Sequence, residues 1–545
     1  MLDFKKQTVY QIYPKSFQDS DQDGLGDLRG ITARLDYLQW LGVGMIWSTP
    51  FFPSPQRDNG YDVSDYYNVD PRFGTMEDLE TLIAEAGRRG IGLMLDMVFN
   101  HTSTEHEWFR RALSGEREYQ DYYIFRDGDP DRPPTNWVSK FGGPAWEYVP
   151  SLGKWYLHLF DVTQADLNWE NPAVRHALRD VLRFWKNKGV QGFRFDVINL
   201  ISKPKILGDD PAGDGRRFYT DGPRVHEYLK ELVAGSGIGD LVTVGEMSST
   251  SLENCVRYTA PEERELSMCF SFHHLKVDYP DGDKWRLMPP DLSRLKALLT
   301  QWQEGMQAQN GWNALFWCNH DQPRSVSRFG DEGRWWKESA KMLACALHLM
   351  RGTPYIFQGE EIGMTNAHYR RIDQYRDVES LNRYRILLEQ GKSPEEALEI
   401  LAARSRDNGR TPMQWSNAPA AGFTGGVPWI CPPENYPDIH VERQLRDEDS
   451  ILAFYRRLIR LRHERAVISH GDIAFLYRDH PSVLAYLRST RNEQLLVLCN
   501  LKEDCPTLTL PEGWARSEIL LSNHSRDALR EELTLRPYEC LALTR

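Results

Sequence analysis

The sequence predicts an α/β fold, a (β/α)8 barrel of eight parallel strands that alternate with helices, and three observations lead to this prediction. Eight short runs are apolar on both faces, as the strands of a buried parallel sheet are. Amphipathic stretches with helix-capping residues separate these runs, and strands that alternate with helices build parallel sheets. The 545 residues leave room for further domains at about 150 residues per domain.

The predicted strands follow one another along the whole first two thirds of the chain. They span residues 8–14, 43–50, 91–100, 192–198, 241–247, 266–272, 314–321 and 354–361. Two helices between them are well marked. Thr75 and Asp78 form a capping box before an apolar stripe that ends at Gly90. Asn171-Pro172 opens another helix, because proline is favoured in the first helical turn. The predicted apolar stripe of this helix is Val174, Leu178, Val181, Leu182 and Trp185.

Two long segments and a change of pattern predict additional domains. The 70 residues after the third strand are too long for an ordinary connection, and a second insertion covers about 362–449. Helix 450–466 carries five arginines, which we interpret as the solvated face of an outer helix rather than an anion-binding patch. Short alternating strands then predict a β-domain. We therefore expect a barrel from residues 1–100 and 168–467, an inserted domain at 101–167, and a C-terminal antiparallel β-sandwich at 468–545.

Composition excludes several classes of function. The chain has 66 Lys and Arg against 78 Asp and Glu, a net charge of −12, which argues against nucleic acid as a partner. No apolar run reaches the ~18 residues of a membrane span, and the N-terminal segment does not resemble a secretory signal. Eight cysteines without a CxxC pair predict thiols rather than a disulfide framework. We expect a cytoplasmic protein, a monomer or weak homo-oligomer.

Polar side chains interrupt the predicted strands at the ends where a barrel carries its active site. Any one of them could be a buried ion pair or a loop cap, but together they indicate a site. Glycoside hydrolysis requires at least two carboxylates on opposite sides of a small site. A phosphate-binding glycine loop and a zinc-binding His/Cys spacing are both absent, which argues against phosphate chemistry and against a zinc site. The interrupting residues are Asp96, His101, Arg194, Asp196, Glu246, His320 and Asp321.

Five motifs together resemble the alpha-amylase family of retaining α-glycosidases: QIYPKSF (11–17), DMVFNH (96–101), GFRFDV (192–197), VGEM (244–247) and NHDQPR (319–324). The resemblance implies that Asp196 is the nucleophile, Glu246 the general acid/base, and Asp321 the carboxylate that holds the distorted sugar. It also implies hydroxyl-binding roles around the first sugar, with Tyr61 as a stacking platform, for Asp58, Tyr61, His101, His320 and Arg410. The resemblance further implies that no metal or other cofactor takes part in catalysis.

The spacing of these residues agrees with the implied roles. Arg194 precedes Asp196 by two residues, so both side chains point to the same side of the strand. We expect Arg194 to line the substrate site and to keep Asp196 ionised. Glu246 lies in an apolar strand, where burial would raise its pKa for proton donation.

An acidic loop near the N-terminus predicts a structural calcium site. Carboxylates at alternate positions, with glycines for a tight turn, suit the hard oxygen ligands that Ca²⁺ prefers. The loop resembles the metal loop of the oligoglucosidase branch of the family, and the alternative is a merely acidic turn. The predicted ligands are Asp19, Asp21, Asp23, Asp27 and the Leu25 carbonyl.

The substrate prediction rests on the loops around the site. Val197 and GEMSSTS (245–251) resemble the exo-acting branch that includes oligo-1,6-glucosidases. Residues 213–229, 271–285 and 315–333 are similar to members that hydrolyse α,α-trehalose 6-phosphate. Basic residues in such loops suit a phosphate. The proposed phosphate ligands are Arg216, Arg217, Lys276 and Lys284, and the alternative is salt bridges to Asp209, Asp210, Asp214 or Asp281.

We therefore expect hydrolysis of α,α-trehalose 6-phosphate to glucose and glucose 6-phosphate, with retention of configuration. The sugar phosphate is the only partner predicted. The alternative enzyme is an oligo-1,6-glucosidase that acts on isomaltose-like sugars. Transglycosylation or isomerisation on the same scaffold stays open, because water and a sugar hydroxyl compete for one covalent intermediate. A catalytically inactive scaffold or transporter subunit would be expected to lose the carboxylates and to carry a membrane segment.

Overall fold

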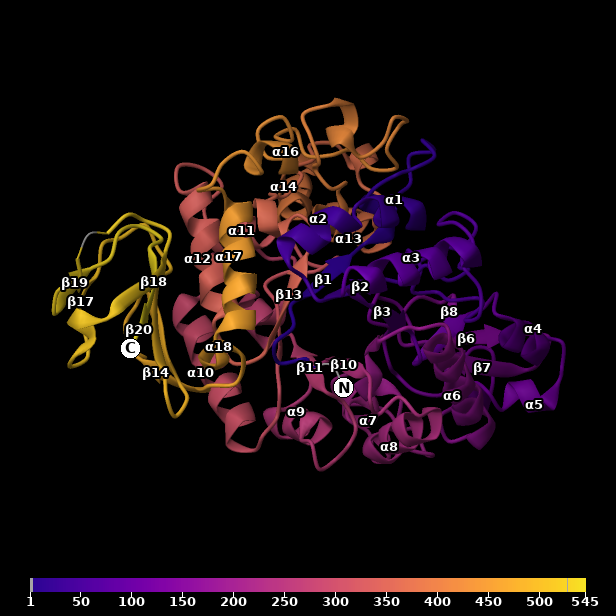
Figure 1. Ribbon diagram of the computed structural model, residues 1–545. Coiled ribbons are helices and arrows are strands. Elements are labelled where there is room, and N and C mark those ends of the chain that lie inside the picture. Colours follow the sequence, from indigo (N-terminus) through magenta and orange to yellow (C-terminus); the bar gives the residue numbers. More distant parts are fainter. Residues whose placement is uncertain (1–2, 527) are drawn as a thin grey trace. The chain divides into compact units, whose positions relative to one another are not determined.

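The computed structural model describes residues 3–526 and 528–545, and Figure 1 shows its helices and strands. The central feature is one sheet of eight strands. Their order in the sheet is β11-β10-β9-β3-β2-β1-β13-β12. The first strand is thus hydrogen-bonded to the last, as the strand order of a closed barrel requires. The strands are β1 (Val9–Ile12), β2 (Met45–Ser48), β3 (Gly92–Met97), β9 (Gly192–Phe195), β10 (Val242–Met247), β11 (Met268–Ser271), β12 (Ala314–Leu315) and β13 (Thr353–Phe357).

All eight predicted strands are confirmed, and each is shorter than the apolar run that predicted it. The difference is largest at β12, which ends at Leu315, whereas the predicted run continued to Asp321. The chain turns after β12, where the Asp321 N–H donates to the Asn319 side chain at 2.8 Å. In β1, Val9 is the parallel partner of Tyr355 in β13.

The two marked helices begin where their caps predict. Before α3 (Met76–Arg88), the Asp78 N–H donates to Thr75 Oγ1 at 3.2 Å, and the Asp78 carboxylate accepts from the Thr75 N–H at 2.8 Å. Before α6 (Pro172–Asn187), Asn171 accepts from the Ala173 N–H at 2.9 Å. The buried stripe of α6 is the predicted one: Val174, Leu178, Val181, Leu182 and Trp185.

Helix α17 (Ile451–Glu464) corrects one detail of the sequence prediction. Arg456, Arg457 and Arg460 are exposed, as the prediction of a solvated face requires. Arg462 is buried instead, and it donates to the backbone carbonyls of Lys5 and His348. The solvated-face prediction is therefore wrong for Arg462, which is buried and hydrogen-bonded to backbone carbonyls.

The chain contacts divide into two compact units. The first comprises residues 47–87 and 92–271, and the second comprises residues 3–46, 88–91 and 272–545. In the first unit, residues 101–167 carry two short helices and two small antiparallel sheets. These elements are α4 (Glu107–Leu113), α5 (Arg117–Gln120), β4 (His101–Ser103), β5 (Phe125–Asp127), β6 (Trp146–Val149), β7 (Lys154–Leu157) and β8 (Gln164–Asp166).

This inserted segment packs against the chain just after Asp196. Trp137, Trp146 and Leu157 share a buried apolar cluster with Val197 and Leu200. The tryptophans of the segment thereby form part of the support for the residues that follow β9.

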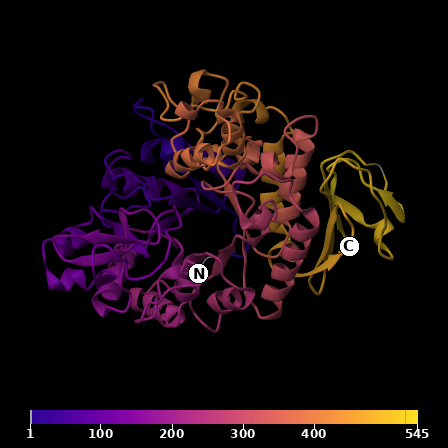
Figure 2. The same cartoon turned by 180° about the vertical axis from the view of Figure 1, so that it is seen from behind.

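The C-terminal part of the second unit is antiparallel, as predicted. Its five-stranded sheet has the order β14-β15-β16-β20-β18, and β17 pairs with β19. Both sheets contribute to one buried leucine-rich core. Figures 1 and 2 show this region beside α10 (Leu292–Ala308), α12 (Trp336–His348) and α17. The strands are β14 (Asp472–Leu476), β15 (Val483–Ser489), β16 (Gln494–Asn500), β17 (Thr507–Thr509), β18 (Glu518–Ser522), β19 (Glu532–Thr534) and β20 (Cys540–Thr544).

The insertion after β13 supplies α13 (Val378–Glu389) and α14 (Pro394–Arg404). Ser393 and Glu396 form a capping box before α14. All eight cysteines carry unbridged thiols. Over the described ranges, none of the helices is both long enough and apolar enough to cross a membrane.

Candidate active site

Three carboxylates of the first unit converge on one guanidinium. Arg194 in β9 is the register partner of Asp96 in β3 and of Val244 in β10, so the side chains near it come from three neighbouring strands. Its Nη1 lies 2.6 Å from Asp96 Oδ1 and 2.6 Å from Asp196 Oδ1, and its Nη2 contacts Glu246 Oε2. The predicted contact between Arg194 and Asp196 is confirmed.

Burial and charge shift the pKa values in this cluster. Burial raises the pKa of Asp96 to about 7, although the adjacent Arg194 opposes the shift. Burial also disfavours the charged form of Arg194, but Asp96 and Asp196 outweigh it and raise the pKa of the guanidinium. Arg194 is therefore a permanent cation that can hold the two predicted catalytic carboxylates in place.

The residue after Asp196 has an unusual backbone conformation. Val197 has φ 35° and ψ 40°, in the left-handed region that a β-branched side chain rarely adopts. Such a conformation costs about 1–3 kcal/mol and persists only where the surroundings impose it. The buried cluster around Trp137 and Leu200 packs on the Val197 side chain. The chain thus turns sharply at Val197, directly after Asp196.

The predicted sugar-binding residues of the first unit lie in one hydrogen-bonded group. The Tyr61 hydroxyl donates to Asp96 Oδ2 at 3.0 Å, and the Tyr61 carbonyl lies 3.1 Å from His101 Nε2. Gln164 Nε2 lies 3.2 Å from both Asp58 Oδ2 and His101 Nε2. Burial lowers the pKa of His101, which favours the neutral ring. Sequence reasoning missed Gln164, which lies in the inserted segment without a recognisable motif.

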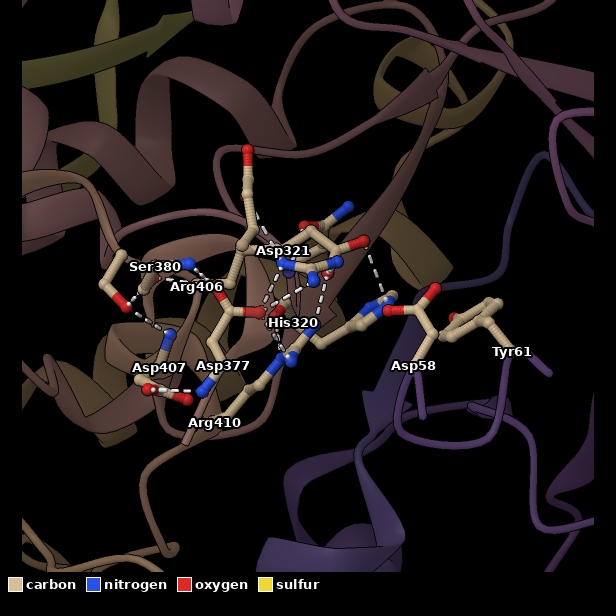
Figure 3. Close-up of polar contacts among 12 residues, drawn as sticks. Asp58, Tyr61, His320, Asp321, Asp377, Ser380, Arg406, Asp407 and Arg410 are labelled. Carbon is tan, nitrogen blue, oxygen red and sulfur yellow. Dashed lines mark hydrogen bonds and ion pairs between the residues drawn. The ribbon is translucent and has the colours of Figure 1, made fainter. Parts of the chain in front are cut away.

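The second unit gathers another polar group around Asp321 (Figure 3). Arg410 donates from Nη2 to Asp321 Oδ1 at 2.8 Å and from Nε to the His320 carbonyl at 3.1 Å. Arg406 Nη1 lies 3.5 Å from the same Asp321 oxygen. His320 Nδ1 lies 2.8 Å from Gln11 Nε2. The structure therefore brings together the predicted His320, Asp321 and Arg410.

Burial would raise the pKa of Asp321, but the charges of His320, Arg406 and Arg410 outweigh it and hold the pKa well below its usual range. Asp321 is consequently a carboxylate throughout the physiological pH range.

Asp377 pairs with both arginines, and Figure 3 shows these contacts. Its Oδ1 accepts from Arg406 Nη2 at 2.7 Å and Nε at 2.9 Å, and lies 3.5 Å from Arg410 Nη1. Its Oδ2 caps α13 by accepting from the Ser380 N–H at 3.0 Å. Sequence reasoning missed both Asp377 and Arg406. The only signal for Arg406 is its position four residues before Arg410.

The four predicted phosphate ligands have different surroundings. Arg216 and Arg217, on α7 (Arg216–Tyr219) of the first unit, lie 3.1 Å from Asp214 and 3.4 Å from Asp210, so the alternative salt bridges are present there. Lys276 and Lys284 belong to the second unit. Lys276 ends η3 (His273–Lys276) and is half-buried.

Lys284 pairs with Glu379 at 2.8 Å and not with Asp281, which pairs with Arg286 at 2.7 Å. The ion pair of Lys284 is therefore made to a carboxylate other than the four that the sequence suggested. Glu379 lies almost a hundred residues further along the chain, so its proximity could not be seen in the sequence.

The acidic loop places three of its four carboxylates together. Ligand oxygens of Asp19, Asp21 and Asp27 all lie within 4.8 Å of one another. Asp27 also caps α1 (Leu28–Ala33) by accepting from the Gly30 N–H at 2.7 Å. Asp23, which was also predicted as a ligand, is not part of this group. Its Oδ1 accepts from the Leu25 N–H at 2.7 Å. This donor set, three carboxylates in a tight turn, fits a hard cation such as Ca²⁺.

Two family models match the chain. The model for "Alpha amylase, catalytic domain" matches residues 11–471, and the model for "Alpha-amylase SusG C-terminal domain" matches residues 483–541.

Similar proteins extend over the full length of the chain. The trehalose-6-phosphate hydrolase of Bacillus subtilis (strain 168) is 52% identical over 99% of this chain and 97% of the relative. The oligo-1,6-glucosidase of Parageobacillus thermoglucosidasius is 47% identical over 98% of each. The crystal structure of Bacillus licheniformis trehalose-6-phosphate hydrolase is 53% identical, with a TM-score of 0.96 over 99% of both chains.

Proposed function

The chain belongs to the alpha-amylase family, and from this premise we propose that it hydrolyses α,α-trehalose 6-phosphate to glucose and glucose 6-phosphate. The observation that carries the reaction class is the convergence of Asp196 and Glu246 on Arg194 at the ends of adjacent strands. The substrate is supported by the relatives: identity is 52% to a trehalose-6-phosphate hydrolase and 47% to an oligo-1,6-glucosidase.

The proposed mechanism is a double displacement. Asp196 attacks the anomeric carbon of the unphosphorylated glucose while Glu246 gives a proton to the glycosidic oxygen, so glucose 6-phosphate leaves. Glu246 then takes a proton from water, which attacks the glucosyl ester and releases glucose with the original configuration. Arg194 keeps both carboxylates oriented.

We assign further roles from family membership and from the contacts above. Asp321 accepts sugar hydroxyl hydrogen bonds, because Arg406 and Arg410 keep its carboxylate ionised and fixed. The hydroxyl-binding residues are Asp58, Tyr61, His101, His320 and Arg410. Arg216, Arg217, Lys276 and Lys284 supply positive charge for the phosphate.

Product analysis with trehalose 6-phosphate tests the proposal most directly. We expect stoichiometric glucose and glucose 6-phosphate, with the α-anomer of glucose formed first by NMR. Neutralising a residue that binds the phosphate should cost about 10- to 150-fold in kcat/KM, from roughly 1.5–3 kcal/mol per charge-assisted hydrogen bond. An uncharged aryl α-glucoside should lose less than about threefold. Equal losses on both substrates for all four residues would contradict a phosphate-binding role.

An oligo-1,6-glucosidase is the second candidate. The 47% identical relative supports it, and so do the acidic partners that Arg216, Arg217 and Lys284 already have in this chain. Turnover of isomaltose that exceeds turnover of trehalose 6-phosphate would favour this candidate.

We propose a structural Ca²⁺ at Asp19, Asp21 and Asp27, with no part in the chemistry. The support is the convergence of the three carboxylates within 4.8 Å. We also propose a reducing compartment such as the cytoplasm, which eight unbridged thiols suit.

A further inference from the structure

Glu379 lies between two cations of the second unit. It is the second residue of α13, and its Oε2 lies 2.8 Å from Lys284 Nζ and 3.4 Å from Arg406 Nε. Arg406 in turn lies 3.5 Å from Asp321 Oδ1. A continuous row of ion pairs therefore leads from Lys284, a proposed phosphate ligand, to Asp321, a proposed sugar ligand.

The Lys284 ammonium is largely enclosed by its own chain. The side chains of Lys284 and Glu379 are only 20% and 23% exposed. The ammonium also lies 4.8 Å from the ring centre of Trp285, and Arg383 lies 5.9 Å from the same ring. A phosphate that reaches Lys284 must therefore share or replace the Glu379 carboxylate, and two anions on one ammonium repel each other.

We propose that Glu379 is a specificity-determining residue that competes with the phosphate for Lys284 and so limits how tightly the phosphorylated product is held. The inference rests on the proposed function, in which the leaving group is glucose 6-phosphate. As this product leaves, Glu379 re-forms its pair with Lys284, and the ammonium does not stay buried without a partner. A neutral sugar leaves the pair undisturbed.

Arg406 does not depend on Glu379 for its position. Asp377 holds it with contacts of 2.7 and 2.9 Å, whereas Glu379 is 3.4 Å away. Removing the Glu379 charge should therefore act mainly on Lys284. This asymmetry separates an effect on phosphate binding from an effect on Asp321.

Glu379→Gln tests the inference, with Glu389→Gln as the matched control at the exposed far end of α13. The inhibition constant of glucose 6-phosphate is measured against hydrolysis of a neutral aryl α-glucoside, and KM is measured for trehalose 6-phosphate. We expect Glu379→Gln to lower both constants by about two- to fivefold, which corresponds to an ion pair of about 0.4–1 kcal/mol. Glu389→Gln should leave both constants unchanged.

Two further variants identify the group through which Glu379 acts. In the Lys284→Gln background, Glu379→Gln should no longer change the inhibition constant, because the competing partner is gone. Glu379→Asp keeps the charge but shortens the reach, so it should lower the inhibition constant by less than Glu379→Gln. It also provides a folded variant if the glutamine does not fold.

The outcomes separate the inference from the proposed function. An inhibition constant that rises or does not change in both Glu379 variants overturns the competitor role, even if trehalose 6-phosphate is hydrolysed. A wild-type enzyme that neither hydrolyses trehalose 6-phosphate nor is inhibited by glucose 6-phosphate overturns the proposed function itself.

Discussion

Asp377→Asn should weaken both the fold of the second unit and the hydrolytic activity. The carboxylate is fully buried, and its two oxygens have different partners, since Oδ1 accepts from Arg406 and Oδ2 caps α13 through Ser380. An asparagine has only one acceptor oxygen, so either the arginine or the helix cap must face an NH₂ group instead.

The expected loss follows from these contacts. Loss of an N-cap costs about 1 kcal/mol. Replacing a carboxylate by a neutral acceptor costs about 1 kcal/mol for each of the two close Arg406 contacts, from about 1.5–3 kcal/mol for charged and about 1 kcal/mol for neutral hydrogen bonds. We expect a destabilisation of about 2–4 kcal/mol. Because Arg406 and Arg410 also lose the charge that fixes them beside Asp321, kcat should fall about tenfold, which is about 1.4 kcal/mol.

Urea unfolding followed by tryptophan fluorescence measures the first effect, and kcat on an aryl α-glucoside measures the second. Ser380→Ala is the control, because it removes the 2.7 Å hydroxyl hydrogen bond to Asp377 and keeps the charge. It should cost about 1 kcal/mol of stability and change kcat by less than about twofold. If Asp377→Asn loses no more stability than Ser380→Ala and keeps the wild-type kcat, our account of this network is refuted.

Four further predictions concern the first unit and the acidic loop. Asp196→Asn should abolish turnover while the protein still folds, because an amide cannot form the glucosyl ester, and near-normal rates would exclude Asp196 as the nucleophile. Glu246→Gln should slow hydrolysis most for aryl glucosides with poor leaving groups, which need protonation. Burial raises the pKa of Asp96 to about 7, above its unfolded value of about 3.9, so ionisation costs folding free energy. Wild type should therefore lose stability relative to Asp96→Asn as pH rises from about 4 to 7, and parallel stability curves would argue against this shift. Chelation of Ca²⁺ should lower the melting midpoint while activity at low temperature persists, whereas a midpoint insensitive to both chelation and added Ca²⁺ would count against a site at Asp19.

The sequence predicts best those features that depend on local periodicity. Apolar residues recur at regular intervals along α6 and continuously in the eight strands. The sequence therefore predicts directly that these side chains are buried. The two-residue spacing of Arg194 and Asp196 likewise predicts a contact, because alternate strand residues share a face.

Features that depend on distant segments could not be predicted. Glu379 and Asp377 lie in a long insertion without periodicity, and their partners Lys284 and Arg406 give no sign of the pairing. Arg462 follows the pattern of an exposed face, yet the carbonyls that surround it come from the N-terminal segment and from α12. The left-handed backbone of Val197, which packs in one cluster with the inserted segment, has no local signature in the sequence.

The pairing of β1 with β13 has a consequence for synthesis of the chain on the ribosome. Val9 is translated early, but its partner Tyr355 emerges only after most of the barrel has been made. At a translation rate of about 5–20 residues per second, one edge of β1 stays without its hydrogen-bonding partner for roughly 20–70 s. All four residues of β1 are buried in the finished fold, so the nascent chain exposes an apolar strand edge during this interval. Slower translation before β13 should therefore increase aggregation more than slower translation within the C-terminal β-domain.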